Sequence, residues 1–124
     1  DHPLARKTHL SWQAYFEQDY IGLDRVSGNR TLLDRELAHL TPARPSICET
    51  RHVTTMLGMV EAGIGIAAVP AMSMPAGEHS ILRAVPLTDP VVTRTVGLIR
   101  LSGRIQSYVA AELEKLIIEQ YPSG

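Results

Sequence analysis

Residues 51–70, RHVTTMLGMVEAGIGIAAVP, constrain the fold of this chain more than any other stretch. Apolar residues in the first half (Val53, Leu57, Val60) recur at the three-to-four spacing of one helix face. Gly63 follows where a helix would end in the left-handed conformation that glycine adopts at little cost. The apolar run IGIAAVP then fits a strand covered on both faces, as in a parallel sheet. Together with the preceding strand-like run PSICET, this stretch predicts one β-α-β crossover.

The rest of the chain predicts further strands and helices in alternation. Ser11 is a candidate cap of a short helix that places Trp12 and Phe16 on one face, and the last expected strand is rich in β-branched residues. We expect strands at 20–23, 46–50, 64–70, 81–85 and 91–101, helices at roughly 11–16, 29–40, 53–62 and 105–120, and a loop with one helical turn at 71–79. This order predicts an α/β fold with a mostly parallel sheet and flanking helices.

Composition and charge exclude several classes of protein. The 124 residues are 44% hydrophobic, and 12 basic side chains nearly balance 13 acidic ones without forming a basic stripe. Direct binding of a nucleic-acid backbone by this chain therefore has no support. No apolar run approaches the roughly 18–20 residues that span a bilayer, and no signal peptide is visible. Cys48 is the only cysteine, so no internal disulfide can form, which fits a reducing compartment.

The glycines of the central stretch nominally match a dinucleotide-binding motif, Gly63-x-Gly65-x-x-Ala68. That motif needs a strand before its glycines and a helix after them, so that a phosphate meets the helix N-terminus. Here the expected helix comes first and the strand follows. Gly63 is better explained as a helix stop, and Gly65 as a position where another backbone or helix packs closely.

No constellation of catalytic or metal-binding residues emerges from the sequence. Ser27 lacks the G-x-S-x-G frame of an activated serine. The five histidines show no spacing typical of a metal site. Cys48 is more readily explained as a small buried residue than as a reactive thiol. We therefore predict no catalytic residue, no cofactor and no metal.

Two turns remain as candidate binding positions. Residues 24–29 and 50–54 each follow an expected strand and precede an expected helix, at the sheet edge where ligands of parallel α/β proteins collect. Exposed helix N–H groups at that edge favour anions. Candidate donors to a small carboxylate or phosphate are Ser27, Gly28, Asn29, Thr54 and Thr55. The same residues would alternatively serve only to cap their helices, and the sequence alone favours neither explanation.

Several motifs, in order along the chain, resemble the effector-binding region of LysR-type transcriptional regulators. They are HPLA at 2–5, YIGL at 20–23 with SG at 27–28, the run ExRHVxTxLxxVEAGIGIAxVP at 49–70, and LxDPxxxRxxGL at 87–98. Each motif alone is loose, whereas the ordered set is fairly specific and covers essentially the whole chain.

The resemblance implies a periplasmic-binding-protein type II-like fold of two α/β subdomains with an effector cleft between them. Residues 1–18 and 92–124 would belong to the first subdomain and 19–91 to the second, so that the chain holds one complete subdomain and part of another. The resemblance further implies a cytoplasmic regulator whose full chain begins with a winged helix-turn-helix and a linker helix. Neither is found in these residues, and the opening part of the first subdomain is missing too, so we expect a fragment of a longer chain.

Effectors of the resembled family are typically organic acids, amino acids or related metabolites, and their occupancy is relayed allosterically to the DNA-binding domain. The resemblance implies effector contacts at the segments that match the two turns: Ser27, Gly28, Asn29, His52, Val53 and Thr54. Arg51 and His52 would either complement an anionic effector or lie on the solvated rim. No residue is given a catalytic role.

The missing part of the first subdomain has a further consequence. The apolar face expected on helix 105–120 would lack its usual cover, which favours association, so we predict a homo-oligomer, most simply a dimer. A periplasmic solute-binding protein has the same fold and is the alternative to a regulator; a signal peptide upstream would favour it, and an upstream helix-turn-helix would exclude it. A small enzyme is the least favoured class.

Overall fold

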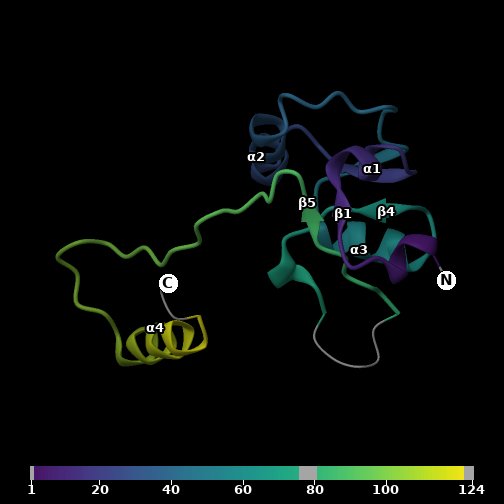
Figure 1. The fold of residues 1–124 in the computed structure, drawn as a ribbon. Helices are drawn as coiled ribbons and strands as arrows, with labels where there is room; N and C mark the ends of the chain where they lie inside the picture. Colours follow the sequence, from purple (N-terminus) through teal and green to yellow (C-terminus); the bar gives the residue numbers. More distant parts are fainter. Residues whose placement is uncertain (1, 76–80, 122–124) are drawn as a thin grey trace. The chain divides into compact units, whose positions relative to one another are not determined.

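The computed structural model describes residues 2–75 and 81–121. They fall into two compact units, Asp1–Val92 and Thr93–Gly124, and each unit is described here by itself (Figure 1). The first unit contains η1 (Pro3–Arg6), β1 (Leu10–Ser11), α1 (Trp12–Phe16), β2 (Tyr20–Leu23), α2 (Gly28–Glu36), β3 (Cys48–Thr50), α3 (Val53–Glu61), β4 (Ile66–Ala67), η2 (Ala71–Ser73) and β5 (Leu87–Thr88). The second unit contains α4 (Tyr108–Gln120).

The first unit is built on a parallel sheet in which β2 lies between β3 and β4. Tyr20 pairs with Ile66 at the start of β2, and Leu23 pairs with Thr50 at its end. A separate parallel pair joins β1 to β5. The β-α-β crossover predicted over the central stretch is confirmed, because β3, α3 and β4 follow one another and both strands pair with β2.

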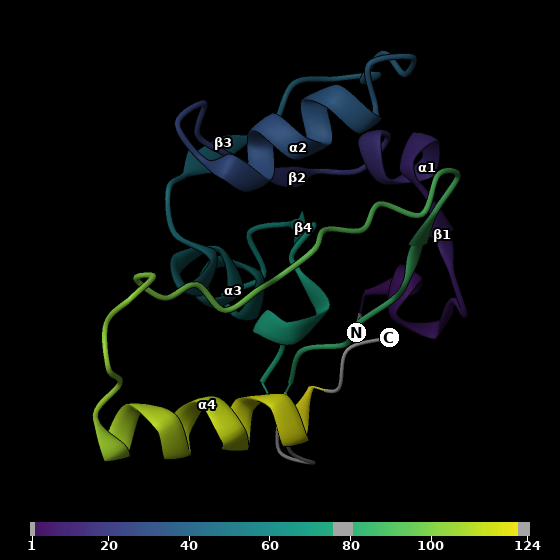
Figure 2. The ribbon, with the colours of Figure 1, turned by 90° about the vertical axis from the view of Figure 1, so that its left-hand side faces the viewer.

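Helices α2 and α3 cover opposite faces of this sheet (Figure 2). Successive side chains of β2 point to opposite faces. Tyr20 therefore joins a cluster with Trp12, Tyr15 and Leu37 on the side of α2, whereas Ile21 and Leu23 pack with Met56 of α3 on the other side. Both clusters are built from buried apolar side chains, so the strand that carries both faces is the centre of the unit.

The short helix α1 forms as its sequence predicts. The Ser11 hydroxyl accepts a hydrogen bond from the N–H of Ala14 at 3.2 Å, which satisfies one of the unpaired donors of the helix start. The rings of Trp12 and Phe16 lie 6.1 Å apart between centroids, on one side of the helix. This segment anchors the aromatic cluster on the α2 side of the sheet.

Gly63 and Gly65 of the central stretch have the structural roles predicted for them. Gly63 ends α3 with a φ of +75°, a conformation that other residues adopt only under strain. A Cβ added to Gly65 would lie 2.5 Å from the carbonyl oxygen of Asp19, so the backbone before β2 approaches too closely for a side chain. Neither glycine precedes a helix, which agrees with the exclusion of a dinucleotide site.

Two predicted strands are wrong. Residues 81–85 form no strand; the chain pairs two residues later, where Leu10 N–H donates to the carbonyl of Pro86 at 2.9 Å and β5 begins. Residues 91–101 are irregular despite their β-branched side chains. A strand exists only where a second strand satisfies its backbone groups, and no strand among the described residues pairs with this segment.

Helix boundaries also differ from expectation. The α2 helix ends four residues before the predicted 40. The α4 helix begins at Tyr108, three residues after the predicted 105, and the hydroxyl of the preceding Ser107 accepts the N–H of Ala110 at 3.3 Å. The helical turn predicted within 71–79 is η2, and residues 76–79 of that loop lie outside the described residues. Within the second unit, the apolar side chains of Val109, Leu113 and Leu116 on α4 are exposed.

Candidate functional site

The carboxyl ends of β2 and β3 lie side by side, and both predicted binding turns leave the sheet there. Leu23 and Thr50 are the last residues of their strands and pair with each other. The next residue, Asp24, donates its N–H to the carbonyl of Thr50 at 3.0 Å, so the pairing continues into the turns. The parallel register thus brings Ser27–Asn29 and His52–Thr54 to one edge of the sheet, as the sequence predicts.

The first turn is shaped by Asp24. One carboxylate oxygen of Asp24 accepts the N–H of Val26 at 3.0 Å, and its carbonyl accepts the N–H of Ser27 at 3.1 Å. Asp24 thereby closes a tight turn of the kind that aspartate favours. The α2 helix starts immediately after Ser27, whose side chain makes no capping hydrogen bond. Ser27 and Asn29 are half-buried and Gly28 is exposed.

The second turn leads into α3 in the same way. His52 is the residue before the helix and makes no side-chain capping bond, while its carbonyl accepts the N–H of Met56 at 3.0 Å. Thr54 and Thr55 therefore lie inside the first turn, past the N-cap position that the capping alternative would give them. His52 and Thr54 are exposed and Val53 is half-buried, whereas Met56 is 1% exposed and fixes the start of α3 on the sheet.

An ion pair joins the two turns. The second carboxylate oxygen of Asp24 lies 3.1 Å from Nε of Arg51. Arg51 is 64% exposed in its side chain, so it lies on the rim and its positive charge stays close to both helix starts. The sequence indicated Arg51 as a candidate partner of an anion, but it did not predict the ion pair with Asp24. The signal was the register of two parallel strands, which the sequence does not show.

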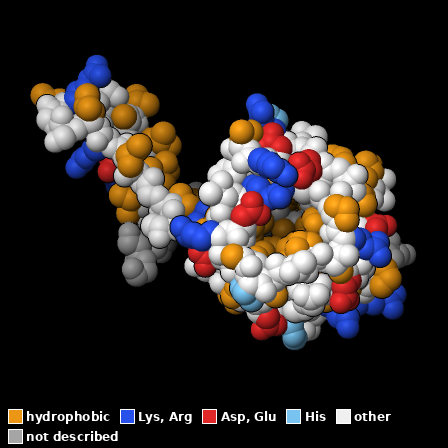
Figure 3. All heavy atoms as spheres, turned by 90° about the horizontal axis from the view of Figure 1, so that it is seen from above, with side chains coloured by type: hydrophobic (Ala, Val, Ile, Leu, Met, Phe, Trp, Pro, Cys, Tyr) orange, Lys and Arg blue, Asp and Glu red, His pale blue; other side chains and the backbone are white. Residues whose placement is uncertain are grey.

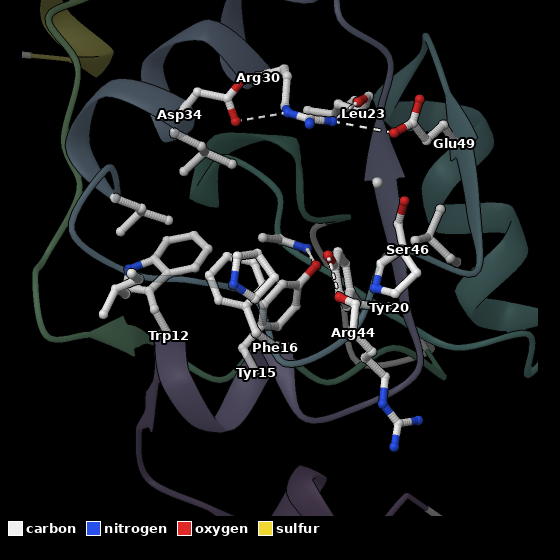
Figure 4. Close-up of a pocket in the computed structure, with 18 of the residues that line it drawn as sticks. Trp12, Tyr15, Phe16, Tyr20, Leu23, Arg30, Asp34, Arg44, Ser46 and Glu49 are labelled. Atoms are coloured by element: carbon white, nitrogen blue, oxygen red, sulfur yellow. Dashed lines mark hydrogen bonds and ion pairs between the residues drawn. The ribbon is translucent and has the colours of Figure 1, made fainter.

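Arg30 on the first turn of α2 ties this helix to the sheet. Its Nε lies 2.8 Å from Oδ1 of Asp34, the pair predicted from the i, i+4 spacing. Its Nη1 donates to the carbonyl of Leu23 at 2.9 Å and to Glu49 of β3 at 3.3 Å, which the sequence did not predict. The hydrogen bond to Asp34 is the main cause that raises the pKa of Arg30, so it stays charged (Figure 4).

A cavity of about 600 Å³ lies on the α2 side of the sheet. Seen from above, hydrophobic side chains form the floor of a hollow and charged side chains lie along part of its rim (Figure 3). The walls of the cavity include Trp12, Tyr15, Tyr20 and Leu33, and burial raises the pKa of both tyrosines above the usual value. The six predicted effector contacts lie outside its lining, but Leu23 at the end of β2 and Arg25 of the first turn are part of it, so the cavity begins next to that turn.

Other kinds of site are not seen in the part of the chain that the structure describes. There, no cluster of three or more histidine, cysteine or acidic side chains has the geometry to hold a metal ion. Cys48 is half-buried in β3 and forms no disulfide. Among the same residues, no helix is long and apolar enough to cross a membrane.

Comparison with known proteins identifies the family. The family model described as "LysR substrate binding domain" matches residues 1–122. The chain belongs to the LysR substrate-binding domain family. Its architecture accordingly is that of the family, a periplasmic-binding-protein type II-like α/β fold, and the resemblance found in the sequence is confirmed.

Curated relatives of this LysR substrate-binding domain are transcriptional regulators. The chain is 40% identical over 118 residues to the uncharacterized HTH-type transcriptional regulator YbhD of Escherichia coli (strain K12), covering 95% of this chain and 37% of the relative. It is 35% identical over 120 residues to the uncharacterized HTH-type transcriptional regulator YfeR of Shigella flexneri, covering 97% and 39%. A shorter match, 37% over 68 residues, covering 55% of this chain and 22% of the relative, is to the transcriptional activator protein LysR of Escherichia coli (strain K12). No solved structure matches the chain.

The chain spans about two fifths of the length of these first two regulators. The assignment of residues 1–18, 19–91 and 92–124 to the family's subdomains stays a prediction. So do the effector contacts at Ser27–Asn29 and His52–Thr54, which the structure places together without a ligand.

Proposed function

We propose that this LysR substrate-binding domain senses a small anionic metabolite, which binds where β2 and β3 end. One observation carries the proposal: the starts of α2 and α3 meet at one sheet edge, and neither Ser27 nor His52, the residues just before them, caps its helix with its side chain. A helix start without a cap leaves backbone N–H groups to be satisfied by water or by a ligand. Two such starts together form a place where an anion is favoured over a neutral molecule.

The charges around this edge support an anionic effector. Aligned peptide dipoles give each helix start a partial positive charge, which stabilises a nearby anion by about 0.3–1 kcal/mol per helix. Arg51 adds a full positive charge at the rim, although Asp24 offsets part of it. Ser27 and Thr54 add hydroxyl donors on the two helix starts. An organic acid or the carboxylate of an amino acid suits this set of donors.

We propose that the domain binds its effector without chemical conversion and passes the signal on. A ligand that contacts both turns favours whichever conformation brings their donors together, and this preference is the free energy available for allostery. The receiver in our proposal is a DNA-binding domain elsewhere in a full-length cytoplasmic regulator, as the names of the relatives suggest. Exposed apolar side chains on α4 are the reason to propose a homo-oligomer.

A thermal-shift screen of organic acids and amino acids would identify an effector. For a confirmed effector, Ser27→Ala and Thr54→Ala should each weaken binding about ten- to hundredfold, because a hydrogen bond to a charged group contributes about 1.5–3 kcal/mol. Matched controls are Ser46→Ala, before β3 at the other end of the strand, and Thr55→Ala, the next residue of α3. Equal binding by all four variants would refute the proposed site.

A further inference from the structure

The cavity on the α2 side of the sheet exists because α2 is held at its two ends. Near its start, Arg30 binds the carbonyl of Leu23 and the carboxylate of Glu49. Just past its end, Leu37 is buried against the aromatic cluster. Between these anchors Leu33 is only half-buried, and it lines the cavity that lies between the helix and the sheet.

This cavity has the size and surface of a ligand pocket. Its volume of about 600 Å³ falls within the range of about 300–1,000 Å³ typical of small-molecule pockets. Voids larger than a water molecule are few in close-packed interiors. Four aromatic rings line one side (Figure 4), and neighbouring rings lie 5.1–6.1 Å apart with tilted or edge-to-face contacts. Leu33 and Leu40 also line the cavity, so the pocket offers a flat ring both aromatic and aliphatic contacts.

The polar end of the cavity favours a neutral molecule. Arg30 has five N–H donors. Among the described residues, acceptors are found for its Nε and Nη1, which leaves the two hydrogens of Nη2 for another acceptor. Its single positive charge is already flanked by the carboxylates of Asp34 and Glu49. Arg25 also lines the cavity, but it is exposed, so water and salt screen its charge and a further anion gains little there. At the other end, Arg44 is paired with Asp19 at 2.8 Å.

We propose that this cavity is a second ligand site, lined by none of the six predicted effector contacts, which takes a neutral and mainly aromatic small molecule with one hydrogen-bonding group. Its ring packs between the aromatic cluster and Leu33, and its polar group lies at the Arg30 end. The α2 helix forms one wall of the cavity and also begins at the strand-end turns. A ligand bound in the cavity would therefore affect the position of the helix start that we assign to the effector.

The neutral fluorescent probe N-phenyl-1-naphthylamine tests this site. Trp12 is the only tryptophan of the chain and lies in the cavity wall, so a bound probe should quench Trp12 emission and gain fluorescence by energy transfer. We expect saturable binding with one probe per chain. Absence of saturable energy transfer would overturn the proposal.

Substitutions locate the probe. Leu33→Trp places a bulky ring inside the cavity and should weaken probe binding at least tenfold, measured by direct excitation of the probe. Leu40→Trp fills the cavity from the loop after α2 and serves if Leu33→Trp does not fold. The matched control Leu32→Trp adds the same ring to the same helix outside the lining and should bind within twofold of the parent. Unchanged binding by a folded cavity-filling variant would overturn the proposal.

The effector site is tested separately in the same assay. Ser27→Ala and Thr54→Ala should leave probe binding within twofold, because neither residue lines the cavity. Loss of probe binding in these variants would place the probe at the strand-end turns and refute a second site. In contrast, if Ser27→Ala and Thr54→Ala left effector binding unchanged, the proposed effector contacts would be wrong, but the test of probe binding in the cavity would be unaffected.

Discussion

Replacing Gly65 by alanine tests the packing that holds β4 on the central strand. The added Cβ would meet the carbonyl oxygen of Asp19 at 2.5 Å and Cδ1 of Ile47 at 3.2 Å. That same carbonyl accepts the N–H of Ile66 at 3.0 Å, where the pairing of β2 with β4 begins. The clash therefore opposes a backbone hydrogen bond and cannot be relieved by turning a side chain. Overpacking costs about 1–3 kcal/mol and the weakened hydrogen bond about 1 kcal/mol, so we expect a loss of about 2–4 kcal/mol in the free energy of unfolding.

Substitutions at two other glycines of the same stretch provide controls, because they are expected to change the free energy of unfolding in opposite directions. Gly58 lies within α3 with nothing within 4 Å of an added Cβ, so Gly58→Ala should stabilise the protein by about 0.5–1 kcal/mol. Gly63 has an equally open surrounding but a φ of +75°, so Gly63→Ala should cost about 1–2 kcal/mol through backbone strain.

Urea unfolding followed by Trp12 fluorescence measures all three variants, since a change in midpoint at constant slope reports a change in stability. The predicted order of stability is Gly58→Ala above the parent, then Gly63→Ala, with Gly65→Ala lowest. A Gly65→Ala variant as stable as the parent would show that Asp19 does not approach this position, and the reasoning about β4 would fail.

Three further outcomes follow from burial and charge. Met56→Ala should cost about 2–5 kcal/mol because Met56 is 1% exposed, whereas Met72→Ala, at 57% exposed, should change the unfolding free energy by less than about 0.5 kcal/mol. Burial raises the pKa of Tyr15 above 10.0, so the unfolded chain releases this proton first and stability should fall as pH rises above about 10; Tyr15→Phe should show a shallower fall in urea titrations at pH 9–11. Arg51→Gln breaks the exposed pair with Asp24 and should cost less than about 1 kcal/mol in unfolding, yet calorimetry should show weaker binding of an anionic effector.

The parts of the fold that the sequence predicted are those with local signals. The helical spacing before Gly63, the Ser11 cap and the Arg30–Asp34 pair each depend on residues a few positions apart, and all three are present. The prediction of a strand at 91–101 is wrong because it depends on a contact with a distant segment and not on a local signal. The β-branched residues of this segment favour an extended backbone, but only a partner strand makes that backbone a sheet, and residue types within one segment cannot show whether a partner exists.

In the candidate site, too, the local features were predicted from the sequence and the long-range contacts were not. Residue order placed Ser27 and Thr54 at strand ends, which predicted a common edge once the sheet was taken to be parallel. Register determines which side chains meet there, and register alone brings Asp24 to Arg51 and Glu49 to Arg30. The cavity beneath α2 was not predicted either, because it depends on where both ends of that helix are anchored.

Backbone amide chemical shifts, followed during titration with a confirmed effector, test the central claim most directly. Our account predicts that the largest shifts fall on Ser27–Asn29 and His52–Thr54, at the carboxyl ends of β2 and β3. Largest shifts at the opposite ends of the strands, near Asp19 and Gly65, or within α4 would contradict it.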